Sequence, residues 1–353
     1  MLLTKRIELH LLRVGRCRHP EWVTLSGGRW AAIDFPALAA LLLHPTAGPI
    51  LYDTGYAERF WPATTPFPER IYRWITPVHL PEEERLATQL GRLGIALGDV
   101  RKVLISHLHA DHVAGLRDLP GAGFLALRGD VLACLGRTGW QALRRGFLPA
   151  LLPPDFPARL ALVDERPVVD LGPSWAPFES GYDLLGDGSL VGIPLPGHSP
   201  AQLGVLLRTT DGRPVLLAAD SCWSARAWRE GRMPSIVARP LFADWGDYRR
   251  TLAGLRQLAD RQPELAIIPS HCAETLASFD PHRPAPPEAA SPGPSPPSPL
   301  SHTHSHPPGR GGIDLASIEP LGGGTPLPGG GSACGRGDGG EGPGEAASPG
   351  GPG

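Results

Sequence analysis

Val103-Leu104-Ile105-Ser106-His107-Leu108-His109-Ala110-Asp111-His112 is the stretch that decides how this chain folds. Its apolar beginning is typical of a buried strand, and three histidines and an aspartate follow within six positions. If a helix begins near Asp111, the two histidines of His107-Leu108-His109 point to one side and Asp111-His112 points to the other. Two facing ligand pairs can hold two cations, because imidazole and carboxylate are groups that borderline metals prefer. The stretch therefore predicts a metal site at the end of a strand.

Further segments place a histidine or an aspartate after an apolar run or in a glycine turn. They are Gly197-His198-Ser199-Pro200, Leu216-Leu217-Ala218-Ala219-Asp220 and Ile267-Ile268-Pro269-Ser270-His271. Asp53-Thr54-Gly55 follows the apolar run Ile50-Leu51-Tyr52 in the same way. Asp53 has two interpretations, a carboxylate that orients a ligand histidine or an aspartate that makes a turn.

In their order along the chain, these segments resemble the motifs of the metallo-β-lactamase-fold hydrolases. The resemblance runs from about residue 5 to about residue 280. It implies an α+β fold, an αββα four-layer sandwich with the metals at one edge. We assign this hydrolase domain to residues 1–281. Residues 282–353 are rich in proline and glycine with too few apolar residues to bury a core, so we expect a disordered tail there.

The resemblance also implies a metal-ligand set. It places His107, His109 and His198 on one metal, Asp111, His112 and His271 on the other, and Asp220 as the bridge. Two zinc ions per chain are expected, and iron or manganese also fits these ligands. A hydroxide held between the metals would attack a carbonyl carbon. Asp111 is then either a ligand only or also the group that passes the proton to the departing oxygen.

The segments around His198 and Asp220 look most like the branch of N-acyl homoserine lactone hydrolases. Members of that branch carry a catalytic tyrosine where this chain has Trp223, whose indole N–H donates a hydrogen bond but exchanges no proton near neutral pH. Asp111 and Trp223 are therefore the expected catalytic residues. The expected reaction is cleavage of a carboxylic ester or lactone. A glyoxalase II-like thioester hydrolase, and a non-hydrolytic di-iron redox or metal-binding module, are the alternatives.

Composition narrows the partners of the protein. The net charge is −2 and no run of Lys and Arg stands out, so a small-molecule substrate is expected rather than nucleic acid. No apolar run reaches about 18 residues, which predicts neither a signal peptide nor a membrane span. The five cysteines are scattered without a Cys-x-x-Cys pair, so we expect a reducing, cytoplasmic compartment. The oligomeric state is not indicated by the sequence.

Hydrophobic periodicity predicts the elements around the motifs. Strands are expected at residues 7–11, 38–43, 50–52 and 265–269, and hairpins at 182–193 and 203–218. Helices are expected at 81–94, within 129–157 and at 244–260, and a loop at 16–28. In the helix expected within 129–157, one face should carry Trp140, Leu143 and Phe147. Aromatic residues are expected to wall the site, namely Phe60, Trp61, Tyr72, Trp74 and Trp223.

Overall fold

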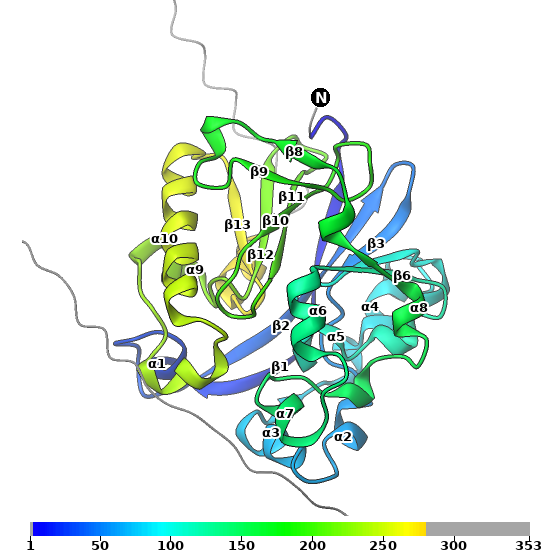
Figure 1. Ribbon diagram of the computed structural model, residues 1–353, viewed down its shortest axis with the longest axis vertical. Coiled ribbons are helices and arrows are strands. Elements are labelled where there is room, and N and C mark those ends of the chain that lie inside the picture. Colours follow the sequence, from blue (N-terminus) through cyan, green and yellow to red (C-terminus); the bar gives the residue numbers. More distant parts are fainter. Residues whose placement is uncertain (1–2, 280–353) are drawn as a thin grey trace, which may run out of the picture. The chain divides into compact units, whose positions relative to one another are not determined.

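The structure, a computed structural model, describes residues 3–279, and its strands form two sheets (Figure 1). The first contains β1 (Glu8–Pro20), β2 (Ala32–His44), β3 (Gly48–Tyr52), β4 (Val78–His79), β5 (Lys102–Leu104), β6 (Gly123–Ala126) and β7 (Leu160–Leu162) in the order β4-β1-β2-β3-β5-β6-β7. The second contains β8 (Val168–Asp170), β9 (Ser180–Asp183), β10 (Val191–Pro194), β11 (Leu203–Arg208), β12 (Pro214–Ala219) and β13 (Ala266–Pro269) in the order β13-β12-β11-β10-β9-β8.

Short helices and one long helix cover these sheets (Figure 1). Those near the first sheet are α2 (Phe60–Ala63), α3 (Arg70–Ile75), α4 (Leu86–Arg92), α5 (Ala110–Val113), α6 (Arg128–Cys134), α7 (Gly139–Leu143) and α8 (Phe156–Arg159). The others are α1 (Glu21–Thr24), α9 (Ala225–Glu230), α10 (Trp245–Arg261) and α11 (Ala273–Ser278). None of the helices within residues 3–279 has the length and apolar character that crossing a bilayer requires.

The four layers follow from the two-residue period of the strands. In β2, Leu41 packs into the core beneath the helices of the first sheet, whereas its neighbour Leu42 packs between the two sheets. In β12, Leu217 faces the first sheet and Leu216 packs with Leu255 of α10. Each sheet is thus apolar on both faces, and the αββα sandwich expected from the sequence is confirmed.

Most of the expected elements are present near their expected positions. The two hairpins pair β9 with β10 and β11 with β12, and α10 begins after Asp244, whose side chain accepts a hydrogen bond from the Asp247 amide. This capping explains why the amphipathic pattern becomes helical at that residue. The strand expected at 265–269 is β13.

Three expectations about single elements were wrong. The segment 16–20 is not a loop but the second half of β1, paired to β2 beyond a register shift between Arg13 and Arg16. The helix at 81–94 is broken at Arg85 into a 3-10 turn and α4, and Glu84 at the end of that turn is buried and paired with Arg13. The region 129–157 forms α6 and α7 instead of one helix, with positive φ at Gly136 between them.

The strand ends that carry the motifs meet at one edge because of parallel pairing. β3 and β5 run parallel with Tyr52 beside Leu104, so the residues that follow them emerge side by side. β12 and β13 run parallel in the second sheet, which brings the residues after Ala219 and Pro269 together. The Leu203 amide of β11 donates to the Ser106 carbonyl at 2.9 Å, which ties the two sheets together at this edge. The proposed tail at 282–353 lies outside the described residues.

Candidate metal centre

The ligand candidates from four separate segments converge at this edge. They form three overlapping groups, whose potential ligand atoms lie within 4.8 Å of one another: His107, His109 and His198; His107, His112 and Asp220; Asp111, His112 and His271. Together the groups contain all seven residues that the motifs indicated. No other group of this kind is found among residues 3–279.

Several nitrogen and oxygen atoms at the centre of the cluster have no hydrogen-bond partner although they are buried. They are His107 Nε2, His112 Nε2, His198 Nδ1 and Asp220 Oδ1. A buried polar group without a partner is costly, and native proteins rarely leave one unsatisfied. Atoms of this kind gathered among imidazoles and carboxylates fit a bound divalent cation, which would occupy lone pairs that no protein donor reaches. The residues present therefore fit the metal that the motifs imply.

Hydrogen bonds at the outer nitrogens orient two of the candidate ligand histidines, His112 and His271. His112 Nδ1 lies 2.8 Å from Asp53 Oδ2, and the other Asp53 oxygen accepts from the Ser106 amide at 2.8 Å. His271 Nδ1 donates to the Pro36 carbonyl at 2.6 Å. Such partners hold a metal-binding imidazole in one tautomer and one orientation. Of the two interpretations of Asp53, these contacts support the carboxylate that orients a histidine. Asp53 also lies in the turn after β3.

Backbone strain is concentrated next to the cluster. Asp53 has φ 60° and Ala219, immediately before Asp220, has φ 47°, both in the left-handed region that residues with a Cβ rarely adopt. Strain of this kind persists where surrounding contacts over-determine it, and it occurs preferentially at functional sites.

Although the charges of Asp111 and Asp220 raise the pKa values of His112 and His271, burial keeps the other three imidazoles neutral. It lowers the pKa of His109 to about 4, and it also lowers the pKa values of His107 and His198 well below their usual range. A metal ligand must be deprotonated at the binding nitrogen, so this effect of burial matches the requirement of metal binding.

A cavity of about 740 Å³ opens above the cluster. His109, Asp111, His198, Asp220 and His271 contribute to its lining, whereas His107 and His112 lie deeper. Its walls come from both halves of the chain and include Phe35, Ile71, Tyr72, Leu143, Trp223 and Phe242. The volume suits a small organic molecule.

The expectation of an aromatic wall was right in part. Tyr72 and Trp223 line the cavity. Phe60 instead lies in the core beneath the helices of the first sheet, and Trp61 packs against that core. Trp74 is 65% exposed on α3. The shared face expected for Trp140, Leu143 and Phe147 was wrong, because Phe147 is buried in the core while Trp140 and Leu143 line the cavity.

Trp223 is bonded to the cluster itself. Its indole N–H donates to Asp220 Oδ2 at 3.0 Å. The ring is 5% exposed and packs edge-on against Phe35, with ring centroids 5.6 Å apart. This donor is therefore engaged with a ligand carboxylate.

Sequence reasoning did not single out Asp130, which is 2% exposed and also lines the cavity. One of its oxygens accepts from the Leu108 amide at 2.7 Å, which fixes the backbone between His107 and His109. Burial raises the Asp130 pKa to about 7. An acid in the first turn of a helix is so common on protein surfaces that no sequence signal distinguished it.

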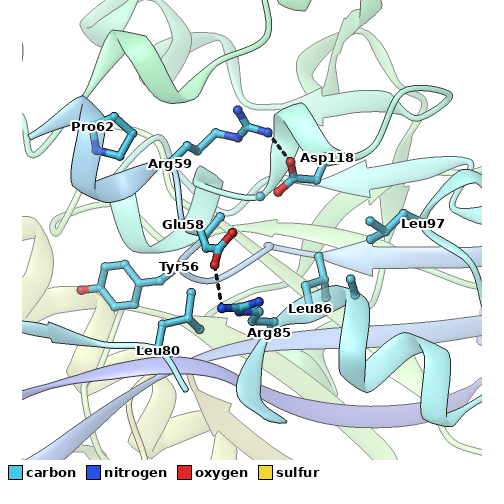
Figure 2. Close-up of a pocket in the computed structure, with 12 residues that line it drawn as sticks. Tyr56, Glu58, Arg59, Pro62, Leu80, Arg85, Leu86, Leu97 and Asp118 are labelled. Atoms are coloured by element: carbon cyan, nitrogen blue, oxygen red, sulfur yellow. Dashed lines mark hydrogen bonds and ion pairs between the residues drawn. The ribbon is translucent and has the colours of Figure 1, made fainter. Parts of the chain in front are cut away.

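A second cavity, of about 470 Å³, shares only Tyr56 with the first (Figure 2). Its charged side chains pair with each other, Arg59 with Asp118 and Arg85 with Glu58, the second pair at 2.6 Å. None of the seven ligand candidates is among the described residues that line it. The larger cavity, which five of the ligand candidates line, is therefore the candidate active site.

Comparison with known proteins agrees with this geometry. Residues 34–271 match the family described as the metallo-beta-lactamase superfamily, which is more than half of the 353 residues. The chain belongs to the metallo-β-lactamase superfamily. This metallo-β-lactamase-fold protein is a metal-dependent hydrolase, as the motifs indicated.

Its relatives lie in the lactonase-like branch of the superfamily, which confirms the resemblance. N-acyl homoserine lactonase AttM of Azorhizobium caulinodans is 27% identical over 286 residues, covering 77% of this chain and 96% of AttM. N-acyl homoserine lactonase AiiB of Agrobacterium fabrum is 28% identical over 253 residues, covering 70% of this chain and 83% of AiiB.

Solved structures show the same metallo-β-lactamase fold. The crystal structure of a quorum-quenching N-acyl homoserine lactone lactonase has a TM-score of 0.58 at 20% identity and covers 79% of this chain and 98% of its own. AidC, a dizinc quorum-quenching lactonase, has a TM-score of 0.53 at 16% identity and covers 76% of this chain and 89% of its own. At 20% and 16% sequence identity, the similarity to these two structures shows the fold alone.

Proposed function

We propose that this protein is a dinuclear zinc hydrolase that opens lactones, with N-acyl homoserine lactones as the substrate class. The observation that carries the proposal is the convergence of seven ligand side chains beside a 740 Å³ cavity with largely apolar walls. The similarity to AttM and AiiB, both N-acyl homoserine lactonases, supports the substrate class.

The seven side chains divide between two metal positions in this proposal. His107, His109 and His198 would hold one zinc and Asp111, His112 and His271 would hold the other, with Asp220 as the ligand that they share. When bound there, zinc makes hydroxide available near neutral pH and polarises the carbonyl of the substrate. Iron or manganese remains an alternative occupant of the same donors.

Asp111 is the proposed proton carrier. Its side chain is 14% exposed and lines the cavity, and Oδ2 lies 3.5 Å from His271 Nε2. A carboxylate that faces both the ligands and the substrate space can accept the proton of the attacking water. It can then return that proton to the ring oxygen as the carbon–oxygen bond breaks.

Trp223 acts on the reaction through Asp220 in this proposal. The bond from Nε1 to Asp220 Oδ2 holds the bridging carboxylate in one orientation. Partners of metal ligands in this position typically change metal affinity by about 10–100-fold. Trp223 is thus a positioning residue for the metal centre.

A substrate panel tests the proposal. The zinc-loaded enzyme would be assayed with acyl homoserine lactones, simple γ- and δ-lactones, S-lactoylglutathione, aryl esters and a phosphodiester. We expect the acyl lactones to be cleaved with the highest kcat/KM, chelation to abolish turnover, and metal analysis to give close to two zinc ions per chain. His109→Ala should abolish activity while the protein stays folded.

Other outcomes of the panel would change the proposal. Preferred cleavage of S-lactoylglutathione would replace the lactonase assignment with the thioester alternative. Dominant phosphodiester cleavage would overturn the substrate class. Full activity in the metal-free protein would remove the hydrolase mechanism altogether. The cytoplasmic location inferred from the scattered cysteines stays a prediction that fractionation of the host cell can check.

A further inference from the structure

A hydrogen-bond donor on the cavity side would accelerate carbonyl hydrolysis at this centre beyond what the metals supply. When hydroxide attacks, the carbonyl oxygen gains negative charge, and a preorganised donor stabilises that charge most strongly in a site that excludes water. Neutral O–H and N–H groups that line the cavity are the candidates, because their donors need no change of protonation state.

Trp223 does not supply this donor in the structure. Its single N–H is engaged with Asp220, and its ring is fixed between Phe35 and Phe242, with centroids 5.6 Å and 5.1 Å from its own. The indole group has a single N–H. If it donated to the Asp220 carboxylate and to a substrate carbonyl together, both hydrogen bonds would be weakened. Turning the ring would also disrupt its packing against the buried Phe35.

Tyr72 has the opposite situation. It belongs to α3 and lines the cavity together with Asp111 and Asp220. Its ring packs edge-on against the buried Phe60, with centroids 5.7 Å apart, and this contact fixes its orientation. Tyr72 is partly exposed, and no hydrogen-bond partner of its hydroxyl is found among residues 3–279, so the hydroxyl is available to a molecule in the cavity.

The electrostatic surroundings place this phenol near the reacting groups. Burial raises the Tyr72 pKa well above its usual range, and the negative charges of Asp111 and Asp220 raise it further. The hydroxyl therefore keeps its proton across the physiological range. The other tyrosine of the cavity, Tyr56, is only 2% exposed, whereas Tyr72 is partly exposed.

We propose that Tyr72 is a catalytic residue whose hydroxyl donates a hydrogen bond to the carbonyl oxygen of the bound substrate. The inference rests on the proposed hydrolysis of carboxylic esters or lactones and adds the residue that stabilises the developing charge. It also gives α3 a function, because the helix carries the donor into a site whose metal ligands all come from other elements.

Tyr72→Phe tests this role, since it removes the hydroxyl and keeps the ring packed against Phe60. We expect kcat to fall by about 100-fold, the size typical for the loss of one oxyanion donor, with KM changed by far less. Zinc content, melting temperature and the inflections of the pH–rate profile should stay as in the wild type. Tyr182→Phe, which removes a hydroxyl on β9 away from the cavity lining, is the matched control.

A binding measurement separates the hydroxyl from the rate of the chemical step. A γ-lactam analogue offers a carbonyl oxygen and resists ring opening, so its affinity can be measured by titration calorimetry with the zinc-loaded protein. We expect Tyr72→Phe to bind it about 2–10-fold more weakly than the wild type, the effect of one hydrogen bond. Tyr182→Phe should bind it like the wild type.

The possible failures are distinguishable. If the wild type cleaves no lactone or ester, the proposed function fails before Tyr72 is tested. If the wild type is active and Tyr72→Phe retains its kcat, the inference is wrong while the function stands. An intact kcat in Tyr72→Phe together with a large loss in Ser199→Ala would assign the donor to the buried Ser199 hydroxyl instead.

Discussion

At the scale of single residues, the candidate ligands of the metal centre are hydrogen-bonded to side chains that are not ligand candidates themselves. Trp223 donates to Asp220, and Asp53 lies against His112, in each case at 3.0 Å or less. These contacts set which atoms of the ligands point inward. All four side chains of these two pairs are almost fully buried. Water therefore cannot replace either hydrogen bond when its donor or acceptor is removed.

Trp223→Phe should loosen zinc while the aromatic packing is kept. Without the indole N–H, the Asp220 carboxylate loses the partner that orients it, and we expect zinc affinity to fall by about 10-fold. Competition with a colorimetric chelator measures the change.

Trp228→Phe is the matched control, because the Trp228 indole nitrogen is buried without a partner among the described residues. Equal zinc retention in the wild type and in Trp223→Phe would show that the bond to Asp220 does not position the ligand.

At the scale of elements, the loop that carries His198 is held against the start of α10. The Asp244 amide donates to the Gly197 carbonyl and the Ala243 amide donates to the His198 carbonyl, both at 3.0 Å. Gly197 has φ 129°, and a Cβ there would lie 2.2 Å from the Tyr248 backbone nitrogen. The glycine is needed because helix and loop approach each other closely at this point.

Gly197→Ala should therefore destabilise the protein and separate His198 from the other ligands. A backbone clash of this kind belongs to the mechanisms that cost more than about 3 kcal/mol, so we expect a melting temperature several degrees lower and loss of zinc. Thermal unfolding and metal analysis measure both effects.

Gly98→Ala, where no atom lies within 4 Å of the added Cβ, should change the free energy of unfolding by less than about 0.5 kcal/mol. A stable, zinc-replete Gly197→Ala would show that the loop can move away from α10 without consequence.

At the scale of the whole molecule, the site is built where two sheets meet, and every ligand lies within residues 3–279. The first sheet contributes the residues after β5, and the second contributes those after β10, β12 and β13. Neither sheet alone holds a complete set, so metal binding and the docking of the two sheets are expected to stabilise each other.

A chain that ends after Pro281 should keep its zinc content and its kcat/KM, because all seven ligands and the described cores precede that residue. Metal analysis, circular dichroism and the lactone assay on the shortened and full chains make the comparison. Precipitation of the shortened chain, or a loss of zinc, would show that the domain boundary lies further along the chain.

The metal motifs and the α10 helix could be predicted from residue patterns, and the αββα sandwich from the family resemblance that the motifs carry. Those features are encoded locally, in a two-residue or helical period, in glycine turns and in clustered ligand types. The folded structure was needed to show that Asp53 contacts His112, that Trp223 donates to Asp220, and that Tyr72 lines the cavity while Phe60 lies in the core. The physical reason is that these roles depend on atoms of residues distant in sequence, such as Asp53 and His112, which are 59 positions apart. An aromatic or acidic residue has the same local pattern whether it packs, pairs or faces a substrate.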